Sequence, residues 1–357
     1  MQKNKYILLI TIILAVIALI FILRSSKTTI KVDFAVKDFS SITKIFMSDK
    51  NNNTVTIKKL DDLNWLLNDK YPARLDGVTT LLETVSGLQV REPVTIAGRN
   101  TIIKWMAAKS VKVEIYQRVY RINLFNKIKL FPHEKCTKVY YVGDETQDNQ
   151  GNFMLLEGSE EPYIVSLPGF RGFLTPRFTA LESDWRKRVI FELKMADIKS
   201  VKVEYSSAPE SSFEISRFDK NFEIKLLLSN QTMNGFDTLK ILNYMNSFSN
   251  LGFEAFLNDL NKNNKDSITS HKPMAILTVT DITGKVTALK AFLKLAEFGS
   301  VDDVTNKPIT IDRDHFYGLV NNEKDFVLLQ YYIFNSILQP ASYFRLNVEK
   351  NKNKKTI

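Results

Sequence analysis

The sequence is poor in the residues that most metal and redox sites use, with one cysteine and three histidines among 357 residues. A single cysteine, Cys136, cannot build an internal disulfide framework or a cysteine-based zinc site. The motifs G-x-S-x-G and H-E-x-x-H, the phosphate-binding P-loop and the glycines of dinucleotide-binding folds are also absent. We therefore expect a protein that is not an enzyme and that binds no cofactor and no metal.

The body of the chain also lacks an excess of basic residues, although the formal net charge is +10. The excess lies at the ends, because residues 1–31 hold five Lys or Arg and no acid, and residues 349–357 hold four Lys against one Glu. Residues 32–348 hold 40 basic and 38 acidic residues. This near balance excludes an extended basic face, so we expect no nucleic-acid partner.

One long apolar run is present, and it extends from Tyr6 through Leu14 to Leu23 without a charge, a proline or a glycine. As a helix, its 18 residues would cover about 27 Å, close to the thickness of a bilayer's hydrocarbon core. The run is longer than the apolar region of a signal peptide, and no small-x-small cleavage site follows it. We therefore predict a single-pass signal anchor rather than a cleaved signal peptide, with membrane lipid as its partner.

Basic residues flank the apolar run on both sides, so the positive-inside rule does not decide its orientation. Because long C-terminal domains translocate largely regardless of their charge, we expect the body on the extracytoplasmic, periplasmic side of the inner membrane. The predicted organisation is a cytoplasmic tip with the anchor (1–31), a first repeat (32–180), a second repeat (181–348) and a disordered basic tail (349–357).

An internal repeat divides the body. The first copy reads SITKIFMSD, TVTIKKLDDLNWLLN and LDGVTTLLETVSGL, and the second reads DIKSVKVEY, SFEISRFDKNFEIK and FDTLKILNYMNSFSNL in the same order. Three blocks in one order favour duplication over chance. The positions that correspond are Ile45 with Val201, Met47 with Val203, Val55 with Phe213 and Ile57 with Ile215.

The periods within each copy predict an α+β fold, with strand-rich units that each carry one or two helices. Val55 and Ile57 alternate with polar residues as in a half-buried strand. Val78, Leu81, Leu82 and Val85 form a helical stripe behind Asp76 as N-cap, and Leu242, Met245 and Phe248 form one behind Asp237. Further elements are expected as a helix at 100–108, strands at 111–116, 138–143, 152–157, 163–167, 275–279, 286–293 and 326–332, and a polar loop at 258–272.

Two clusters with ligand-type side chains are interpreted as ordinary connections. His133 and Cys136 in FPHEKC have the spacing of half a metal site, but a zinc ion needs three or four protein ligands. GDETQDNQGN lacks the ligand spacing of an EF-hand, which favours a polar hairpin connection.

The segment that joins the copies, LPGFRGFLTPRFTALESDWRKR, is interrupted by Gly and Pro and rich in aromatic residues. Its aromatic residues either wedge the two copies together or form a surface for a partner. The candidate docking residues are Phe170, Arg171, Phe173 and Trp185.

Two long stretches, VYYVGDETQDNQGNFMLLEGSEEPYIVSLPGFRGFLTPRF and DWRKRVIFELKMADIKSVKVEY, resemble the Bacteroidetes branch of the domain of unknown function 4340 family. The resemblance covers nearly the whole chain. It implies one N-terminal anchor and an extracytoplasmic body, and some relatives are encoded beside ABC-type transport or gliding-type envelope systems. It supplies no catalytic residues.

These observations predict a membrane-anchored binding or scaffolding subunit of an envelope complex, with an envelope protein as partner and an auxiliary role beside an ABC-type transport system. Two alternatives stay open. One is an envelope enzyme, and the other is a receptor for a ligand or glycan, each with its site between the two repeats.

Overall fold

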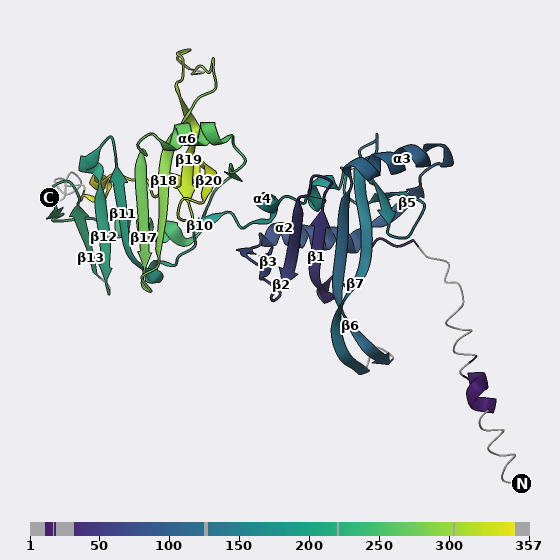
Figure 1. Cartoon of the computed structure of the whole chain (residues 1–357). Helices are drawn as coiled ribbons and strands as arrows, with labels where there is room; N and C mark the ends of the chain where they lie inside the picture. Colours follow the sequence, from purple (N-terminus) through teal and green to yellow (C-terminus); the bar gives the residue numbers. More distant parts are fainter. Residues whose placement is uncertain are drawn as a thin grey trace, which may run out of the picture. The chain divides into compact units, whose positions relative to one another are not determined.

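The computed structural model describes residues 11–16, 18, 32–124, 128–219, 221–302 and 304–346. The chain divides into two compact units, Met1–Trp185 (unit 1) and Arg186–Ile357 (unit 2), both drawn in Figure 1. Each unit contains one nine-stranded sheet and few helices. The chain is therefore a mixed α and β protein in which strands predominate, as the sequence predicts.

The sheet of unit 1 has the strand order β4-β3-β2-β1-β6-β7-β8-β9-β5, and all its neighbouring strands are antiparallel. Its strands are β1 Ile42–Ser48, β2 Thr54–Lys59, β3 Trp65–Leu67, β4 Tyr71–Pro72, β5 Gln89–Pro93, β6 Val111–Leu124, β7 Ile128–Glu145, β8 Asn152–Leu156 and β9 Tyr163–Ser166. The helices are α2 Leu75–Gly87, α3 Ile96–Lys109, α4 Glu182–Trp185, η1 Phe39–Ser41 and η2 Thr175–Phe178.

The sheet of unit 2 has the order β14-β13-β12-β11-β17-β18-β19-β20-β16. Its strands are β11 Ile198–Tyr205, β12 Phe213–Phe218, β13 Asn221–Leu226, β14 Gln231–Thr232, β16 Ala255–Phe256, β17 Ala275–Asp281, β18 Val286–Leu295, β19 Ile311–Val320 and β20 Asp325–Gln330, and a separate pair joins β10 Val189–Phe191 to β15 Leu251–Gly252. The helices are α5 Thr238–Asn246, α6 Lys262–Thr269, α7 Tyr331–Phe334, η3 Met195–Asp197, η4 Pro209–Ser211, η5 Ser247–Ser249 and η6 Ala341–Phe344.

The first two strands of each sheet pair in the same register. In unit 1, Ile45 lies opposite Ile57 and Met47 opposite Val55. In unit 2, the positions that the sequence pattern aligns with these four also pair, as Val201 with Ile215 and Val203 with Phe213. These eight side chains are fully buried, because alternate residues of a strand point to the same face and that face packs on the core.

Each unit has its own hydrophobic core between the sheet and a helix. In unit 1, α2 crosses one face of the sheet (Figure 1) and buries Val78, Leu81 and Val85 against it. In unit 2, α5 buries Ile241, Tyr244 and Met245. Both helices occupy the predicted stretches, and their apolar stripes are core.

One of the two predicted N-caps is correct. The Asp237 carboxylate accepts the backbone N–H groups of Leu239 and Lys240 at the start of α5. The predicted cap at Asp76 is wrong, because the extended residue before α2 is Arg74 and Asp76 already lies in the first turn. There its negative charge interacts favourably with the positive end of the helix dipole.

Three other predictions about local structure need correction. The polar loop expected at 258–272 contains α6, which buries none of its residues and therefore lacks the apolar stripe that marks a helix. The segment with His133 and Cys136 belongs to β7 and is not a loop. The strands expected to end at Tyr116 and to begin at Lys138 both continue, as β6 and β7, into a long hairpin.

No helix among the described residues is long and apolar enough to cross a membrane. Residues 11–16 and 18 are helical, and the side chain of Leu14 is exposed. Tyr6, Leu23 and most of the predicted anchor lie outside the described residues, as does the predicted tail at 349–357.

Candidate functional site

The joining segment places its four candidate docking residues in different environments. Trp185 is 3% exposed, belongs to the core of unit 1, and donates its indole N–H to the Thr179 carbonyl at 2.9 Å. Phe170 is half-buried, and the Arg177 guanidinium lies 4.1 Å from the centre of its ring. Only Arg171 and Phe173 are exposed. Trp185 and most of Phe170 are thus held inside unit 1.

Metal-ligand side chains do not converge. Within the described ranges, no group of three or more His, Cys, Asp or Glu side chains could hold a metal ion. His133 Nδ1 lies 3.4 Å from the Phe131 carbonyl, and the Cys136 thiol lies 3.7 Å from the Lys138 carbonyl. Burial raises the pKa of the Cys136 thiol, so this group is a poor source of thiolate.

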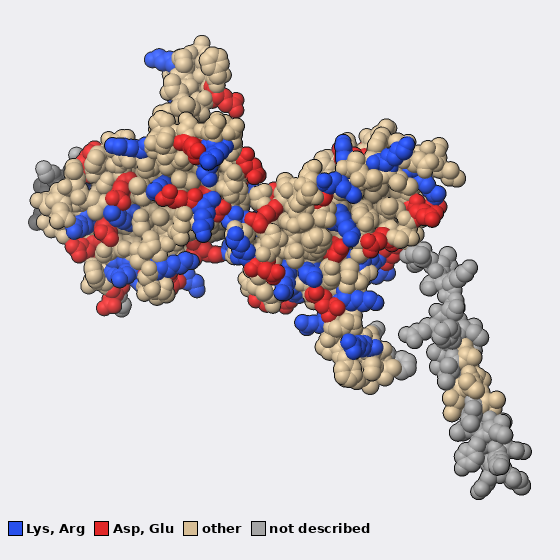
Figure 2. Space-filling model, viewed as in Figure 1, with Lys and Arg blue, Asp and Glu red and all other residues tan. Residues whose placement is uncertain are grey.

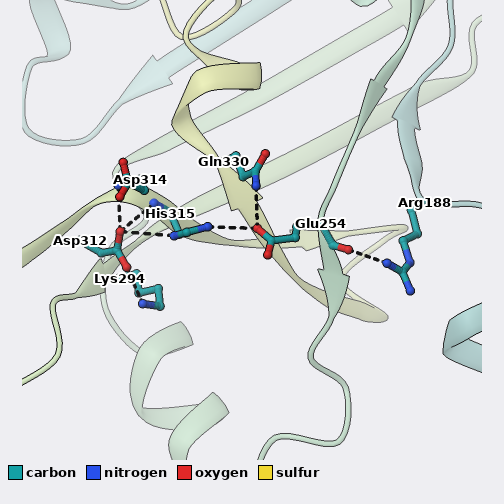
Figure 3. A network of polar contacts seen from close by, with 7 residues as sticks. All are labelled: Arg188, Glu254, Lys294, Asp312, Asp314, His315 and Gln330. Atoms are coloured by element: carbon teal, nitrogen blue, oxygen red, sulfur yellow. Dashed lines mark hydrogen bonds and ion pairs between the residues drawn. The ribbon is translucent and has the colours of Figure 1, made fainter. Parts of the chain in front are cut away.

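A polar network in unit 2 joins β18, β19 and β20 around His315 (Figure 3). The two ring nitrogens of His315 lie 3.1 Å from a Glu254 carboxylate oxygen and 3.5 Å from an Asp312 carboxylate oxygen. Lys294 donates to Asp312 at 2.5 Å, and Gln330 donates to Glu254 at 3.0 Å. Arg188 contributes a bond to the Glu254 backbone carbonyl at 2.7 Å.

The Asp312 carboxylate is the most strongly stabilised charge of this network. Burial raises its pKa, but the Lys294 ammonium and the backbone N–H groups of Asp314 and His315 outweigh that effect and bring the pKa to about 2. The same ion pair raises the pKa of Lys294. None of the seven residues in Figure 3 is a Ser, Thr or Cys that could serve as a nucleophile beside the imidazole.

The network lies at the base of a hairpin between β18 and β19. Leu295 of β18 pairs with Ile311 of β19 at the point where the two strands leave the sheet. Lys294 and Asp312 are the residues next to this pair, so their ion pair closes the base of the hairpin that follows. The network therefore lies at the base of this hairpin, where its two strands leave the sheet.

We call that hairpin the unit 2 arm; it comprises residues 295–302 and 304–311. The arm projects from the sheet in Figure 1. Phe298 is fully exposed, Val304 is 93% exposed and Leu295 is 73% exposed. On the face seen in Figure 2 the arm carries few charged side chains. These large apolar side chains are therefore not part of the core of unit 2.

Local contacts of Asp302 bridge the turn of the unit 2 arm. Asp302 accepts hydrogen bonds from the backbone N–H groups of Val304 and Thr305 and from the Thr305 hydroxyl, and it also pairs with Arg313. These contacts keep the pKa of Asp302 well below its ordinary value. A backbone bridge between Val301 and Pro308 closes the arm.

Unit 1 carries a second projecting hairpin, the unit 1 arm, formed by residues 118–124 of β6 and 128–133 of β7. It extends beyond the neighbouring strands in Figure 1 and presents uncharged surface with Lys and Arg side chains beside it in Figure 2. Sequence reasoning missed both arms. The available signal was the alternation of apolar residues in RVYRINL, which indicates a strand but not whether its apolar face is covered.

A groove of about 740 Å³ lies beside the base of the unit 1 arm. Its walls include Asp38, Lys59 and Asp61 from the body and Gln117 and Lys129 from the hairpin. The Asp61 carboxylate is engaged by its own turn, because it accepts the Asn64 side chain and the Leu63 N–H, which lower its pKa. The groove is polar and carries both signs of charge, so it does not select one ligand class.

Comparison with known proteins gives one match. The family model described as Domain of unknown function (DUF4340) matches residues 69–273, more than half of the chain and parts of both units. No curated protein and no solved structure matches the chain.

Proposed function

The chain belongs to the family of the domain of unknown function DUF4340, and on that premise we propose that it is a membrane-anchored, extracytoplasmic binding or scaffolding subunit of an envelope complex. It performs no chemistry of its own in this proposal. Its partner is another envelope protein, and an ABC-type transporter is the partner class that fits an auxiliary subunit held beside a membrane complex.

The proposed anchor is the apolar run from Tyr6 to Leu23, in a single pass through the inner membrane with the body in the periplasm. The support is compositional, because 18 uncharged apolar residues match the thickness of a bilayer core. An anchor of this kind would restrict the body to a thin layer beside the membrane and raise its effective concentration near other membrane proteins.

We further propose that the two units arose by duplication. The shared strand order and the shared pairing of Ile45 with Ile57 and of Val201 with Ile215 support this origin. The two arms, in contrast, lie at different connections. The unit 1 arm connects β6 to β7, which occupy the places of β17 and β18 in the strand order, whereas the unit 2 arm connects β18 to β19. The two arms therefore serve separate contacts.

The unit 2 arm carries the proposal of a protein partner. Phe298 and Val304 are exposed apolar side chains on a hairpin whose turn is hydrogen-bonded by Asp302 and whose base carries the Lys294–Asp312 ion pair. Local hydrogen bonds of this kind reduce the conformational entropy that a hairpin loses on binding, so its apolar contacts translate more efficiently into affinity. Aromatic residues such as Phe298 act as anchors in protein interfaces. Arg171 and Phe173 of the joining segment are exposed and are proposed as further contacts.

Crosslinking in intact cells tests this function. A photoreactive phenylalanine analogue in place of Phe298 should yield a crosslinked envelope protein that mass spectrometry identifies, and the Val304→Ser change in the same chain should reduce the yield. The same analogue at Tyr332, which is 92% exposed in unit 2 outside the arm, is the matched control and should crosslink weakly. No membrane-protein adduct at Phe298, together with turnover of a cell-wall glycan by the purified protein, would favour the enzyme instead.

A further inference from the structure

Beyond Arg118, the unit 1 arm has one apolar face. Three pairs of directly opposed residues build it, because alternate residues of a strand share a face: Tyr120 with Pro132, Ile122 with Leu130, and Leu124 with Ile128. The side chains of Ile122, Leu124, Ile128 and Leu130 are 41%, 50%, 52% and 46% exposed. A two-stranded ribbon with an uncovered apolar face in water indicates a surface that is covered in the working protein.

The charges of the arm are all of one sign. The sequence from Arg118 to His133 contains four Lys or Arg and no Asp or Glu. Arg121 and the pair of Asn123 with Lys129 occupy the strand positions that alternate with the apolar ones. The Lys129 ammonium lies 5.6 Å from the centre of the Tyr120 ring, so a cation borders the apolar face.

This combination fits a lipid surface with anionic headgroups. An element that lies in a membrane interface buries apolar side chains towards the acyl chains and keeps cations at the level of the headgroups. Tyr120, with an apolar ring and a polar hydroxyl, is a residue type enriched at that level. A protein partner would instead have to supply an acidic surface around an apolar strip.

The covalent reach of the chain allows the contact. Eight residues, 24–31, separate the end of the apolar run from Val32, and they can span at most about 28 Å. The β6 part of the arm from Arg118 to Leu124 covers about 20 Å at the rise of a β-strand. A body tethered so closely to a bilayer can therefore place the tip of an arm of this length on the bilayer surface.

We propose that the apolar face of the unit 1 arm inserts into the interface of an anionic lipid bilayer, the same membrane that holds the proposed anchor. The inference rests on the proposed function in that one respect. The arm is then a second, reversible attachment that fixes the orientation of unit 1 relative to the membrane.

Depth-dependent quenching in vesicles tests the inference with the full-length protein. Leu124→Cys in a Cys136→Ser background accepts a single environment-sensitive dye, and Leu228→Cys, at a 67% exposed residue of unit 2, is the matched control. Brominated lipids in phosphatidylglycerol-containing vesicles should quench the dye at position 124 and not the dye at position 228. Thermal unfolding of each labelled protein checks that the fold is retained.

A charge variant tests the electrostatic part. Arg121→Gln with Lys129→Gln removes two cations. Each cation is expected to raise the partition coefficient onto an anionic surface about fivefold, so the arm should bind that surface about 25-fold more weakly. Quenching at position 124 should fall accordingly, and high salt should have the same effect on the unsubstituted arm. Equal quenching in purely zwitterionic vesicles would contradict the role of charge.

The outcomes separate this inference from the proposed function. Protein that resists alkaline extraction from the vesicles while the dye at position 124 stays unquenched overturns the arm's role and leaves the anchor standing. Protein that alkaline treatment extracts from the vesicles overturns the anchor. In that case the same labelled protein is added to preformed anionic vesicles, where quenching of the dye at position 124 still tests the arm. Energy transfer between dyes on separate arms, or a protein crosslink at position 124 in cells, would identify a second copy or a protein partner and would overturn the lipid assignment.

Discussion

Arg186 and Asp325 form a two-pronged ion pair inside unit 2, although 139 residues separate them in the sequence, with N–O distances of 2.9 and 2.8 Å. Arg186 is the first residue of unit 2, and Asp325 begins β20. Asn258 and Asn321 also donate to the Asp325 carboxylate. The pair therefore ties the beginning of the unit to a strand near the end of its sheet.

Removal of one partner of this pair should destabilise unit 2 strongly. Both residues are buried, at 8% and 5% exposure, so Asp325→Ala removes two charge-assisted hydrogen bonds from a guanidinium in the interior. We expect a loss of about 3–5 kcal/mol in the free energy of unfolding, and a smaller loss for the double variant Arg186→Met with Asp325→Leu. Urea unfolding measures both.

The neighbouring surface pair provides the control for that experiment. The Lys187 Nζ atom lies 2.6 Å from a Glu192 carboxylate oxygen, but the two side chains are 38% and 60% exposed. Lys187→Met should therefore change the free energy of unfolding by no more than about 1 kcal/mol. A loss for Asp325→Ala as small as this control would show that the buried pair does not support the unit.

Acid should weaken unit 2 through Asp312. Its pKa in the folded protein is about 2, below the value near 3.9 for an unfolded chain, so the ionised carboxylate favours the folded state. This contribution is fully present above about pH 4 and is lost as the pH falls from about 4 towards 2. Asp312→Asn should lower stability at pH 6 and flatten its decline between pH 4 and 2. Equal slopes for the two proteins in pH-dependent urea unfolding would refute this origin.

Gly252 should tolerate no side chain. A Cβ atom there would lie 2.6 Å from the backbone oxygen of Arg188, which also accepts the Phe253 N–H at 3.0 Å. Gly252→Ala would separate β15 from β10 and cost about 1–3 kcal/mol. Gly284→Asn is the control, because nothing lies within 4 Å of its Cβ position and Asn accepts the φ of +87° there. Similar melting temperatures for the two variants would contradict this account.

The sequence predicts the parts of the fold that local periodicity controls. Val55 and Ile57 are core residues of β2, and Asp237 caps α5, because alternation and capping involve residues a few positions apart. The alternation of Tyr120, Ile122 and Leu124 is equally regular, yet these residues lie on a projecting arm. Alternation shows which residues share a face, and only the tertiary structure shows what covers that face.

The sequence could not predict the candidate surfaces, because they too depend on the tertiary structure. Lys294, Asp312 and His315 meet Glu254 only after three segments of unit 2 come together, and no spacing in the sequence encodes that meeting. The aromatic content of the joining segment left Trp185 either as a wedge between the copies or as part of a docking surface, and its indole packs in the core of unit 1. Aromatic residues favour interiors and interfaces alike, so composition alone cannot separate the two.

A measurement of membrane topology most directly tests the claim that this protein is a membrane-anchored extracytoplasmic subunit. Alkaline phosphatase and a fluorescent protein that folds only in the cytoplasm are fused in turn to the C-terminus of the full-length protein and expressed in cells. A membrane-anchored extracytoplasmic subunit predicts high phosphatase activity and low fluorescence, with both fusions retained in the membrane fraction. Low phosphatase activity with high fluorescence, or release of the protein from the membrane, would contradict it.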